Sequence, residues 1–414
     1  MTSRRAVIGG GAGAAVLAAL GYRVWDRGVF SAGEGPAYEP WSEWQGHAGE
    51  GSHRPLHAAI LAASAHNTQP WIFEPHEGSI TVYADRARNL GSFDPFRREM
   101  HLSLGCAIEN LYLAAFSQGL AAEITFSDGR LAPPSVAVQP SKVAEIKLQP
   151  LQEAFVGSGP LTGEPFDTLQ RLYDVIPKRH TNRGPYSPDR QLPTRFRSFG
   201  GHVSPRWWSI IVVTDKSARQ ELGALIIEAT ERIIADEQMS ADSARWFRTG
   251  RREILAYRDG VTTDTAGLSA GLAAASKILP DQSRRTADRY WLDATRDVQV
   301  ATAAAFGILF VQDRLNMRGA LETGEAWQRL HLTATLDGIA AQPMNQPLEM
   351  MDRDLVLGRK NDYTREIRSM AGLRETESGL SDPAFIFRLG YAERPALPSP
   401  RRPLDDVLRT TGFA

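Results

Sequence analysis

The sequence predicts an α+β fold in which two related halves follow each other in one chain. The 414 residues are enough for two domains, and 42% of them are hydrophobic, which supports a sizeable core. A strand-like run at 80–88 alternates in polarity and ends in charge, and a near copy stands at 210–219. A helical pattern with an early and a closing glycine occurs over 104–120 and again over 323–339. A repeat of this length indicates duplication of a unit of roughly 190 residues.

Residues 1–35 form a separate amino-terminal segment. Arg4 and Arg5 precede an apolar stretch of small residues, Ala6–Leu20, an order typical of an export signal. The Ser-Arg-Arg-x-Val motif resembles a twin-arginine signal, which implies the export machinery as a partner and a periplasmic or membrane-anchored protein. Without that signal the protein is cytoplasmic. The stretch is shorter than the ~20 residues of a spanning helix, and because no clear cleavage site follows, an uncleaved anchor stays open.

The same segment allows a second interpretation. Val7–Ala15 is rich in glycine and reads as the dinucleotide loop of a Rossmann-type FAD enzyme, with Asp26 as the acid that binds ribose. Only three residues remain for the strand between Arg5 and the glycines, and the helix that follows is short for a crossover connection. The export signal is therefore the preferred interpretation.

The rest of the chain divides near a stretch rich in glycine and proline at 157–165, which predicts a linker. The first repeat then covers 50–160 and the second covers 165–414. The second repeat carries additional helical residues at about 220–305. These residues form either a lid over a site or a solvated helical excursion.

A polar run, Ala63–Trp71, is the most informative short segment. Ser64, Asn67 and Gln69 offer hydrogen-bond donors and acceptors at close spacing, and Pro70 prevents a helix from continuing. The apolar residues from Trp71 onward have strand character. A polar loop beside a hydrophobic element suits a planar ligand with polar edges, and a helix terminus with a buried tryptophan is the alternative.

A basic cluster, Pro177–Arg183, is the strongest polar cluster of the chain. Arg179 and Arg183 lie four residues apart, so a helical turn would place both on one face, and Thr181 adds a hydroxyl group. Two guanidinium groups and a hydroxyl are suited to a phosphate monoester. A solvated basic turn is the alternative.

These segments together resemble the nitroreductase-like flavoproteins. Ser64, Asn67 and Gln69 match the Ser-x-x-Asn-x-Gln-Pro-Trp signature of that family, although Ala63 replaces its usual proline. The Arg-His-Thr-Asn-Arg run is similar to the family's phosphate-binding segment. The Gly-Tyr pair at 390–391, followed by Arg401 or Arg402 and a Pro-Leu-acidic run, is similar to its carboxyl terminus.

The resemblance implies an α/β sandwich with FMN between two halves, and the duplicated chain looks like the Acg-type branch, in which one chain imitates a homodimer. A monomer is then possible. The implied reaction transfers hydride from NAD(P)H through FMN to a small electrophilic acceptor, with no covalent nucleophile from the protein. Asn345 falls where the family contacts the edge of the flavin ring. A protein that binds and stores FMN without turnover is the main alternative.

The duplicated halves predict one FMN per chain. The second half has the arginine cluster and the first half has the polar loop, whereas the reverse pair is broken. His53–His57 lacks the arginine pattern, and Val203–Trp208 lacks the asparagine and glutamine. We expect Trp207 or Trp208 to close the second site.

Other chemistries fit the sequence less well. Lys+Arg 47 against Asp+Glu 48 gives no field that favours nucleic acid. The Gly-x-Ser-x-Gly motif at 267–271 has no apolar strand ahead of it, which argues against a hydrolase. His53 and His57 have helical metal spacing, but Pro55 lies between them and no third ligand is evident. Cys106, the only cysteine, has apolar neighbours and is predicted to lie in the core.

Overall fold

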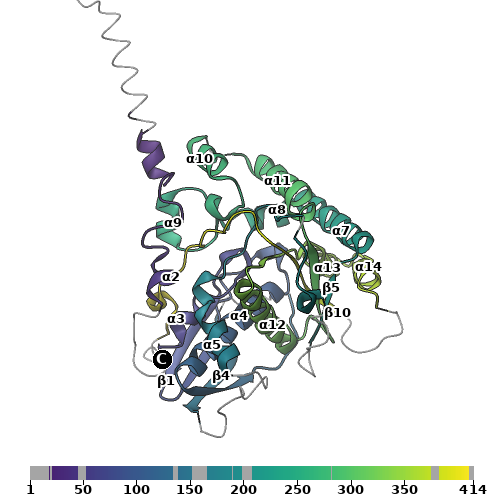
Figure 1. Cartoon of the computed structure of the whole chain (residues 1–414). Helices are drawn as coiled ribbons and strands as arrows, with labels where there is room; N and C mark the ends of the chain where they lie inside the picture. Colours follow the sequence, from purple (N-terminus) through teal and green to yellow (C-terminus); the bar gives the residue numbers. More distant parts are fainter. Residues whose placement is uncertain are drawn as a thin grey trace, which may run out of the picture.

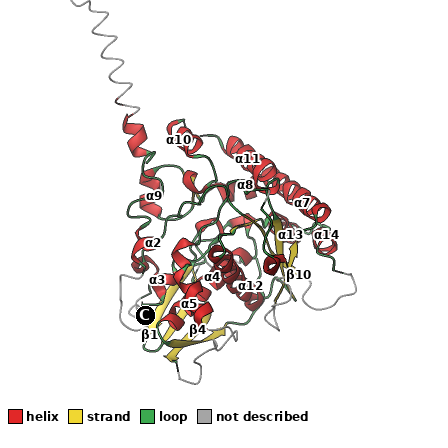
Figure 2. Ribbon diagram, in the orientation of Figure 1, coloured by secondary structure: helices red, strands yellow, loops and turns green. Residues whose placement is uncertain are grey.

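The computed structural model describes residue 18 and residues 21–44, 53–133, 139–151, 166–188, 190–197, 208–280, 282–373 and 382–409. Residues 1–17, 19 and 20 of the proposed signal segment 1–35 lie outside these residues, as do the linker at 157–165 and Trp207. The predicted α+β class is confirmed, since helices pack against two four-stranded antiparallel sheets (Figure 1 and Figure 2). Within the described part of the chain, no helix combines the length and the apolar character that a membrane crossing requires.

The first half begins with two short helices and continues through its sheet and one long helix. These elements are α2 (Glu39–Glu43), α3 (Leu56–Ala59), β1 (Trp71–His76), β2 (Ser79–Ala84), α4 (Arg98–Ser117), β3 (Leu120–Phe126) and β4 (Ser141–Pro150).

The second half repeats this plan around its own sheet and long helix. Its elements are α5 (Phe166–Asp174), α6 (Thr194–Arg197), β5 (Trp208–Val213), β8 (Ala305–Val311), α12 (Met317–Leu336), β9 (Ala340–Pro343), α13 (Gln346–Val356), α14 (Tyr363–Met370) and β10 (Asp382–Gly390). Between β5 and β8 the chain forms an inserted segment, α7 (Lys216–Ala235), α8 (Glu237–Ala244), β6 (Phe247–Arg248), α9 (Arg251–Tyr257), β7 (Val261–Thr262), α10 (Ala270–Ile278), α11 (Arg284–Asp293) and the π-helical η8 (Ala294–Val300).

The two sheets share one topology. Their strand orders are β1-β2-β4-β3 and β5-β8-β10-β9, so in each sheet the strands taken in chain order lie first, second, fourth, third. In each half the long helix connects the second strand to the third, α4 in one and α12 in the other. Helix α4 packs on the first sheet, α12 packs on the second, and the two helices pack on each other. The layers are therefore sheet, helix, helix, sheet.

The helix repeat predicted at 104–120 and 323–339 falls on these two equivalent helices, whereas the strand repeat was aligned wrongly. The run at 80–88 contains β2, the second strand of its sheet, and the run at 210–219 contains β5, the first strand of the other. The resemblance came from two alternating apolar strands that each end in a charged turn, a pattern that many half-buried strands share.

The carboxyl-terminal tail returns to the first half. Leu408 pairs with Phe73 of β1 in a parallel bridge, and the Arg409 N–H donates to the Phe73 carbonyl at 2.8 Å. Further back in the tail, the Arg401 N–H donates to the carbonyl of Ala37 at 2.7 Å. The tail thus joins the amino-terminal helices to the end of the second sheet, and it carries Arg401 toward the loop ahead of β1.

Candidate functional site

One pocket gathers most of the residues predicted to bind a ligand. Five separate parts of the chain line it: α2, the loop ahead of β1, the basic cluster, the inserted segment and the tail. The lining residues are Trp41, Ala63, Ser64, Asn67, Arg179, His180, Thr181, Arg183, Gly260, Val261, Thr265, Ser399 and Arg401. The cavity volume is about 30 Å³, far smaller than a whole nucleotide.

The loop ahead of β1 is held in an unusual backbone conformation. His66, Asn67 and Gln69 have φ angles of 46°, 54° and 51°, in the left-handed region that residues other than glycine seldom occupy. The hydroxyl of Ser64 accepts a hydrogen bond from the Gln69 N–H at 2.9 Å and so closes the loop. Three such residues in four positions are a strained arrangement of the kind that surrounding contacts maintain at functional sites.

The amide side chains of this loop connect it to the inserted segment and to the tail. Asn67 Nδ2 donates to the carbonyls of Gly260 at 3.1 Å and Pro400 at 2.9 Å. Gln69 Nε2 donates to the Arg258 carbonyl at 2.9 Å, and Gln69 Oε1 accepts from the Arg402 N–H at 2.9 Å. Asn67 and Ser64 line the pocket, whereas Gln69 is fully buried beside it and holds the loop in place.

The basic cluster reaches the pocket, but its predicted helical turn is wrong. The preceding 3₁₀ turn ends at Lys178, and Arg179 is extended with φ −77° and ψ 104°. Arg179, Thr181 and Arg183 nevertheless line one pocket, together with His180. Arg179 donates to the Leu61 carbonyl at 3.2 Å, and Arg183 donates to the Thr265 carbonyl at 3.0 Å.

Of the two tail arginines, Arg401 reaches the pocket and Arg402 does not line it. Arg401 donates to the Asn67 side-chain oxygen and to the Ala62 carbonyl, the latter at 3.1 Å. Its guanidinium group lies 4.6 Å from the centroid of the Trp41 ring. Arg402 instead donates through its side chain to the carbonyls of Gln69 at 3.4 Å and Asp406 at 2.6 Å.

The pocket carries positive charge without a balancing carboxylate. Arg179 and Arg401 are 2% and 3% exposed, and among the described residues neither they nor Arg183 form an ion pair. The Nε atoms of Arg179 and Arg401 have no hydrogen-bond partner. Burial lowers the pKa of Arg179 and of Arg183 to about 10, so both remain cations at neutral pH. Uncompensated buried charge is unfavourable, and an anion in the pocket would relieve it.

His180 contributes to the same field as a neutral ring. Burial, with the charges of Arg179 and Arg401, lowers its pKa to about 3. The ring packs edge-on against Trp41, with the two centroids 4.6 Å apart. The histidine therefore lines the pocket without competing with the arginines for an anion.

The structure does not bring Asn345 into the pocket. The residue is buried and precedes α13, where its side-chain N–H₂ donates to Glu99 at 3.0 Å and its oxygen accepts from the Ile386 N–H at 2.7 Å. It is absent from the lining, and its contact with a flavin ring stays a prediction.

Several lining residues were missed by sequence reasoning. The lining residue Trp41 follows Pro40 and stands three residues before Trp44, a spacing that indicates a short helix with one apolar face. Gly260, Val261, Thr265 and Ser399 have no local signal, because only the path of the inserted segment and of the tail brings them to the pocket. For them the sequence offers no recognisable pattern.

The structure gives no support to the hydrolase motif or to the histidine pair as alternative sites. Ser269 of the Gly-x-Ser-x-Gly motif is the N-cap of α10 and accepts from the Leu272 N–H, which explains it without catalysis. Among the described residues no cluster of histidine, cysteine and carboxylate side chains could hold a metal ion, and His53 and His57 form no such site. Cys106 is buried at 1% exposure, as predicted. The glycine-rich run Val7–Ala15 lies outside the described residues.

No protein-family model matches the chain. A protein of Mycobacterium tuberculosis strain H37Rv named "Putative NAD(P)H nitroreductase" is 26% identical over 368 residues, which cover 85% of this chain and 89% of the relative. A second protein of the same strain, named only as uncharacterized, is 23% identical over 371 residues, 85% of this chain and 90% of its own length. Both likenesses extend over most of each chain.

Solved structures give weaker likenesses. The FMN-dependent nitroreductase NfnB of Mycobacterium smegmatis, in complex with NADPH, has a TM-score of 0.35 and 20% identity, and the match covers 59% of this chain and 97% of that one. A nitroreductase-type protein of Anabaena variabilis has a TM-score of 0.36 and 14% identity, and the match covers 76% of this chain and 69% of that one. Neither score is high enough to bear on function.

Proposed function

We propose that this chain is an FMN-dependent oxidoreductase of the nitroreductase type, which uses NAD(P)H to reduce a small electrophilic acceptor. One observation carries the proposal: Arg179, Arg183 and Arg401 converge on one pocket with Ser64 and Asn67 and lack a carboxylate partner among the described residues. An anionic ligand with several oxygen acceptors fits this set of donors, and a phosphate monoester dianion is such a ligand.

The residues present fit the phosphate end of FMN. Two Nε–H groups without a hydrogen-bond partner, on Arg179 and Arg401, are available as donors. The hydroxyl of Thr181 and the guanidinium group of a third arginine, Arg183, lie beside them. FMN, when bound, supplies hydride transfer, and the side chains would bind and orient it. The strained loop at 64–69 fixes the position of Asn67 for that purpose.

The rest of the cofactor needs more room than this cavity of about 30 Å³ provides. Gly260 and Thr265 belong to the inserted segment, so we expect 245–265 to shift outward when FMN binds. Trp246 reports this shift, because its indole N–H donates to the Asn89 carbonyl at 3.3 Å and its ring lies 5.4 Å from the Arg88 guanidinium. Tryptophan fluorescence should change with FMN in the wild type, and a Trp246→Phe variant should lose part of that change.

The direct test is the colour of the protein. After purification and incubation with FMN, we expect an absorbing flavoprotein from which acid releases FMN. Protein that stays colourless contradicts the proposal. Replacement of the exposed Arg365 by alanine serves as a control that leaves binding unchanged, since this side chain is 62% exposed on α14.

A second candidate function, storage of FMN without turnover, is favoured by the cover that the inserted segment places on the pocket. Asp259, next to the lining residue Gly260, is 2% exposed and pairs with both Arg88 and Arg248. Anaerobic NADH or NADPH separates the two functions. Rapid bleaching followed by reoxidation with an acceptor supports the enzyme, whereas a flavin that stays oxidised supports storage.

We also propose export by the twin-arginine route, supported by Arg4, Arg5 and the apolar stretch Ala6–Leu20. An Arg4→Lys/Arg5→Lys variant should keep its FMN affinity and accumulate in the cytoplasm. Normal arrival of that variant in the periplasm would show that the twin-arginine interpretation is wrong.

A further inference from the structure

A cluster of exposed apolar side chains lies where the amino-terminal segment meets the inserted segment. We call it the aromatic patch and define it by Tyr22, Trp25, Phe30, Tyr257, Leu272 and Leu279. Their exposed fractions are 57%, 63%, 88%, 57%, 59% and 54%. The Tyr22 and Trp25 rings lie 6.1 Å apart, centroid to centroid. Single exposed apolar residues are ordinary on proteins, but six of them on neighbouring elements indicate a surface that a partner covers.

The elements under the patch are fixed to one another. The Arg23 side chain donates to the carbonyls of Ile278 at 2.6 Å and Leu279 at 2.5 Å, at the end of α10. Lys277 of α10 donates to the Gly28 carbonyl at 2.9 Å and pairs with Asp264 at 2.7 Å. Figure 1 shows the amino-terminal helix, drawn in purple, beside α9 and α10 at the top of the molecule. The patch is therefore a built surface of three neighbouring elements.

Arginines accompany the apolar side chains. Arg251 of α9 lies 5.6 Å from the centroid of the Trp25 ring, and the neighbouring Arg252 is 81% exposed and lies 3.7 Å from Asp26. Arg23 and Arg27 stand on the same amino-terminal segment. Residues 21–27 and 251–253 contain four arginines against two acidic residues, Asp26 and Glu253, so these stretches carry net positive charge. Tryptophan, tyrosine and arginine are the residues that favour the boundary between lipid and water.

The sequence ahead of the patch points to the same partner. The apolar stretch Ala6–Leu20 ends one residue before Gly21, and the helical segment that carries Tyr22 and Trp25 begins there. If that stretch enters a bilayer, the patch lies within a few residues of the lipid surface. A second copy of the chain is the other occupant to consider. If the same patch of two copies met, arginines of one copy would lie against arginines of the other, which like-charge repulsion disfavours.

We propose that the aromatic patch docks the folded body of the protein on an anionic lipid surface. The tryptophan and the two tyrosines lie among the headgroups, Phe30 and the leucines reach the acyl boundary, and the arginines contact lipid phosphates. No residue of the patch lines the pocket.

The single native cysteine makes the test simple. Cys106 is 1% exposed, so a cysteine introduced at Leu272→Cys can be labelled alone with an environment-sensitive NBD dye in the full chain. Vesicles of mixed phosphatidylcholine and phosphatidylglycerol should shift the NBD emission to the blue. A control label at Leu355→Cys, 51% exposed, should not respond, because it belongs to α13, which Figure 1 shows away from α9 and α10.

A double substitution, Trp25→Ser/Phe30→Ser, sharpens the test. Both side chains are exposed, so the fold should be retained, which circular dichroism checks. In the Leu272→Cys background it should abolish the blue shift, and the Arg251→Ser/Arg252→Ser pair should weaken vesicle binding of the body on the order of tenfold. The Leu272 label reports the body itself, so an inserted amino-terminal stretch cannot mimic the signal.

Three results would overturn the proposal. The first is no shift at Leu272 with anionic vesicles, or an equal shift at Leu355. The second is a shift of the same size with vesicles of pure phosphatidylcholine, because docking would then not require anionic lipid. The third is a shift that grows with protein concentration in the absence of vesicles, which assigns the patch to a second copy of the chain.

Discussion

Gly105 of α4 and Gly324 of α12 lie against each other where the two long helices cross. A Cβ atom on Gly105 would stand 1.9 Å from the Leu321 carbonyl oxygen, and one on Gly324 would stand 2.1 Å from that of Leu102. Each would also lie 3.0 Å from the Cα of the opposite glycine. The crossing is thus reciprocal, and the close approach of the two backbones requires glycine at both positions.

Replacement of Gly324 by alanine should therefore destabilise the fold strongly. The clash is with backbone, which cannot move aside without separating the helices, and overpacking of this kind costs roughly 1–3 kcal/mol or more. Urea unfolding measures the change. Gly271→Ala is the matched control: it lies in α10 with no atom within 4 Å of an added Cβ, so it should be neutral or stabilise by roughly 0.5–1 kcal/mol. Equal effects of the two substitutions would contradict the crossing.

This glycine pair was available from the sequence as a repeated pattern, because packing between equivalent helices demands the same small residue in each. The strand repeat misled, because alternation identifies a strand but not its place in a sheet. The polar residues of the pocket could be predicted where several of them lie close together in the sequence, as Ser64 and Asn67 do. Thr265 and Ser399 could not be predicted as lining residues, because they come from segments far away in the sequence.

Arg179 offers a test in which stability and binding change in opposite senses. Its hydrogen bonds, to the Leu61 carbonyl and to His331, measure 3.2 and 3.3 Å, and its Nε has no partner. Arg179→Met removes a buried cation that lacks a counter-ion among the described residues, so the apoprotein should be as stable as the wild type or more so. FMN affinity should nevertheless fall about 10- to 100-fold, because charge-assisted hydrogen bonds contribute roughly 1.5–3 kcal/mol.

Isothermal titration with FMN and thermal unfolding of the apoprotein measure the two effects, with the exposed Arg365→Met as the control. A large loss of apoprotein stability would indicate that Arg179 has a structural role. Unchanged FMN affinity would refute its role in the phosphate site.

Stability should fall in acid through His101 of α4. Its Nδ1 lies 2.7 Å from the Arg97 carbonyl and so donates to it, while Nε2 is buried without a partner. Burial lowers the pKa of His101 from 6.5 to about 4. Between these two values the unfolded chain binds the proton and the folded protein does not, so the contribution of His101 to stability is present above about pH 6.5 and is lost as the pH falls toward 4.

The unfolding free energy of the wild type, minus that of a His101→Leu variant, should thus decline across this range by at most roughly 3 kcal/mol. Urea unfolding at several pH values gives this difference. His53→Leu, at an exposed residue, is the matched control for the replacement of a histidine by leucine. A flat difference for His101 would mean that its pKa is the same in the folded and the unfolded protein.

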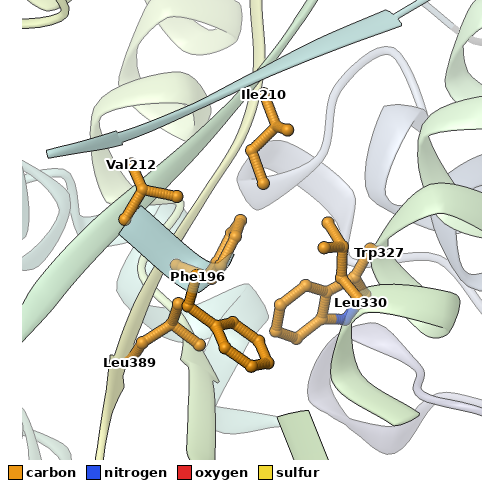
Figure 3. A pocket seen from close by; sticks show the side chains of 7 residues that line it. Phe196, Ile210, Val212, Trp327, Leu330 and Leu389 are labelled. Atoms are coloured by element: carbon orange, nitrogen blue, oxygen red, sulfur yellow. The ribbon is translucent and has the colours of Figure 1, made fainter. Parts of the chain in front are cut away.

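The stoichiometry should be one FMN per chain, because the arginines that line the described pocket come only from the second half and the tail. Trp208 begins β5 as Trp71 begins β1, and Trp208 is half-buried against the core. A second cavity under the second sheet is lined entirely by apolar side chains, namely Phe196, Ile210, Val212, Trp327, Leu330, Phe387 and Leu389 (Figure 3).

That second cavity has a volume of about 10 Å³ and none of its lining side chains carries a charge, so a phosphate dianion there would be buried without a cationic partner. Flavin released by acid from a weighed sample gives the ratio directly. Arg179→Ala/Arg183→Ala should reduce the ratio toward zero rather than by half, since a single site loses two of its three arginines. A wild-type value near two, or a residual value near one in the double variant, would show that a second FMN site exists.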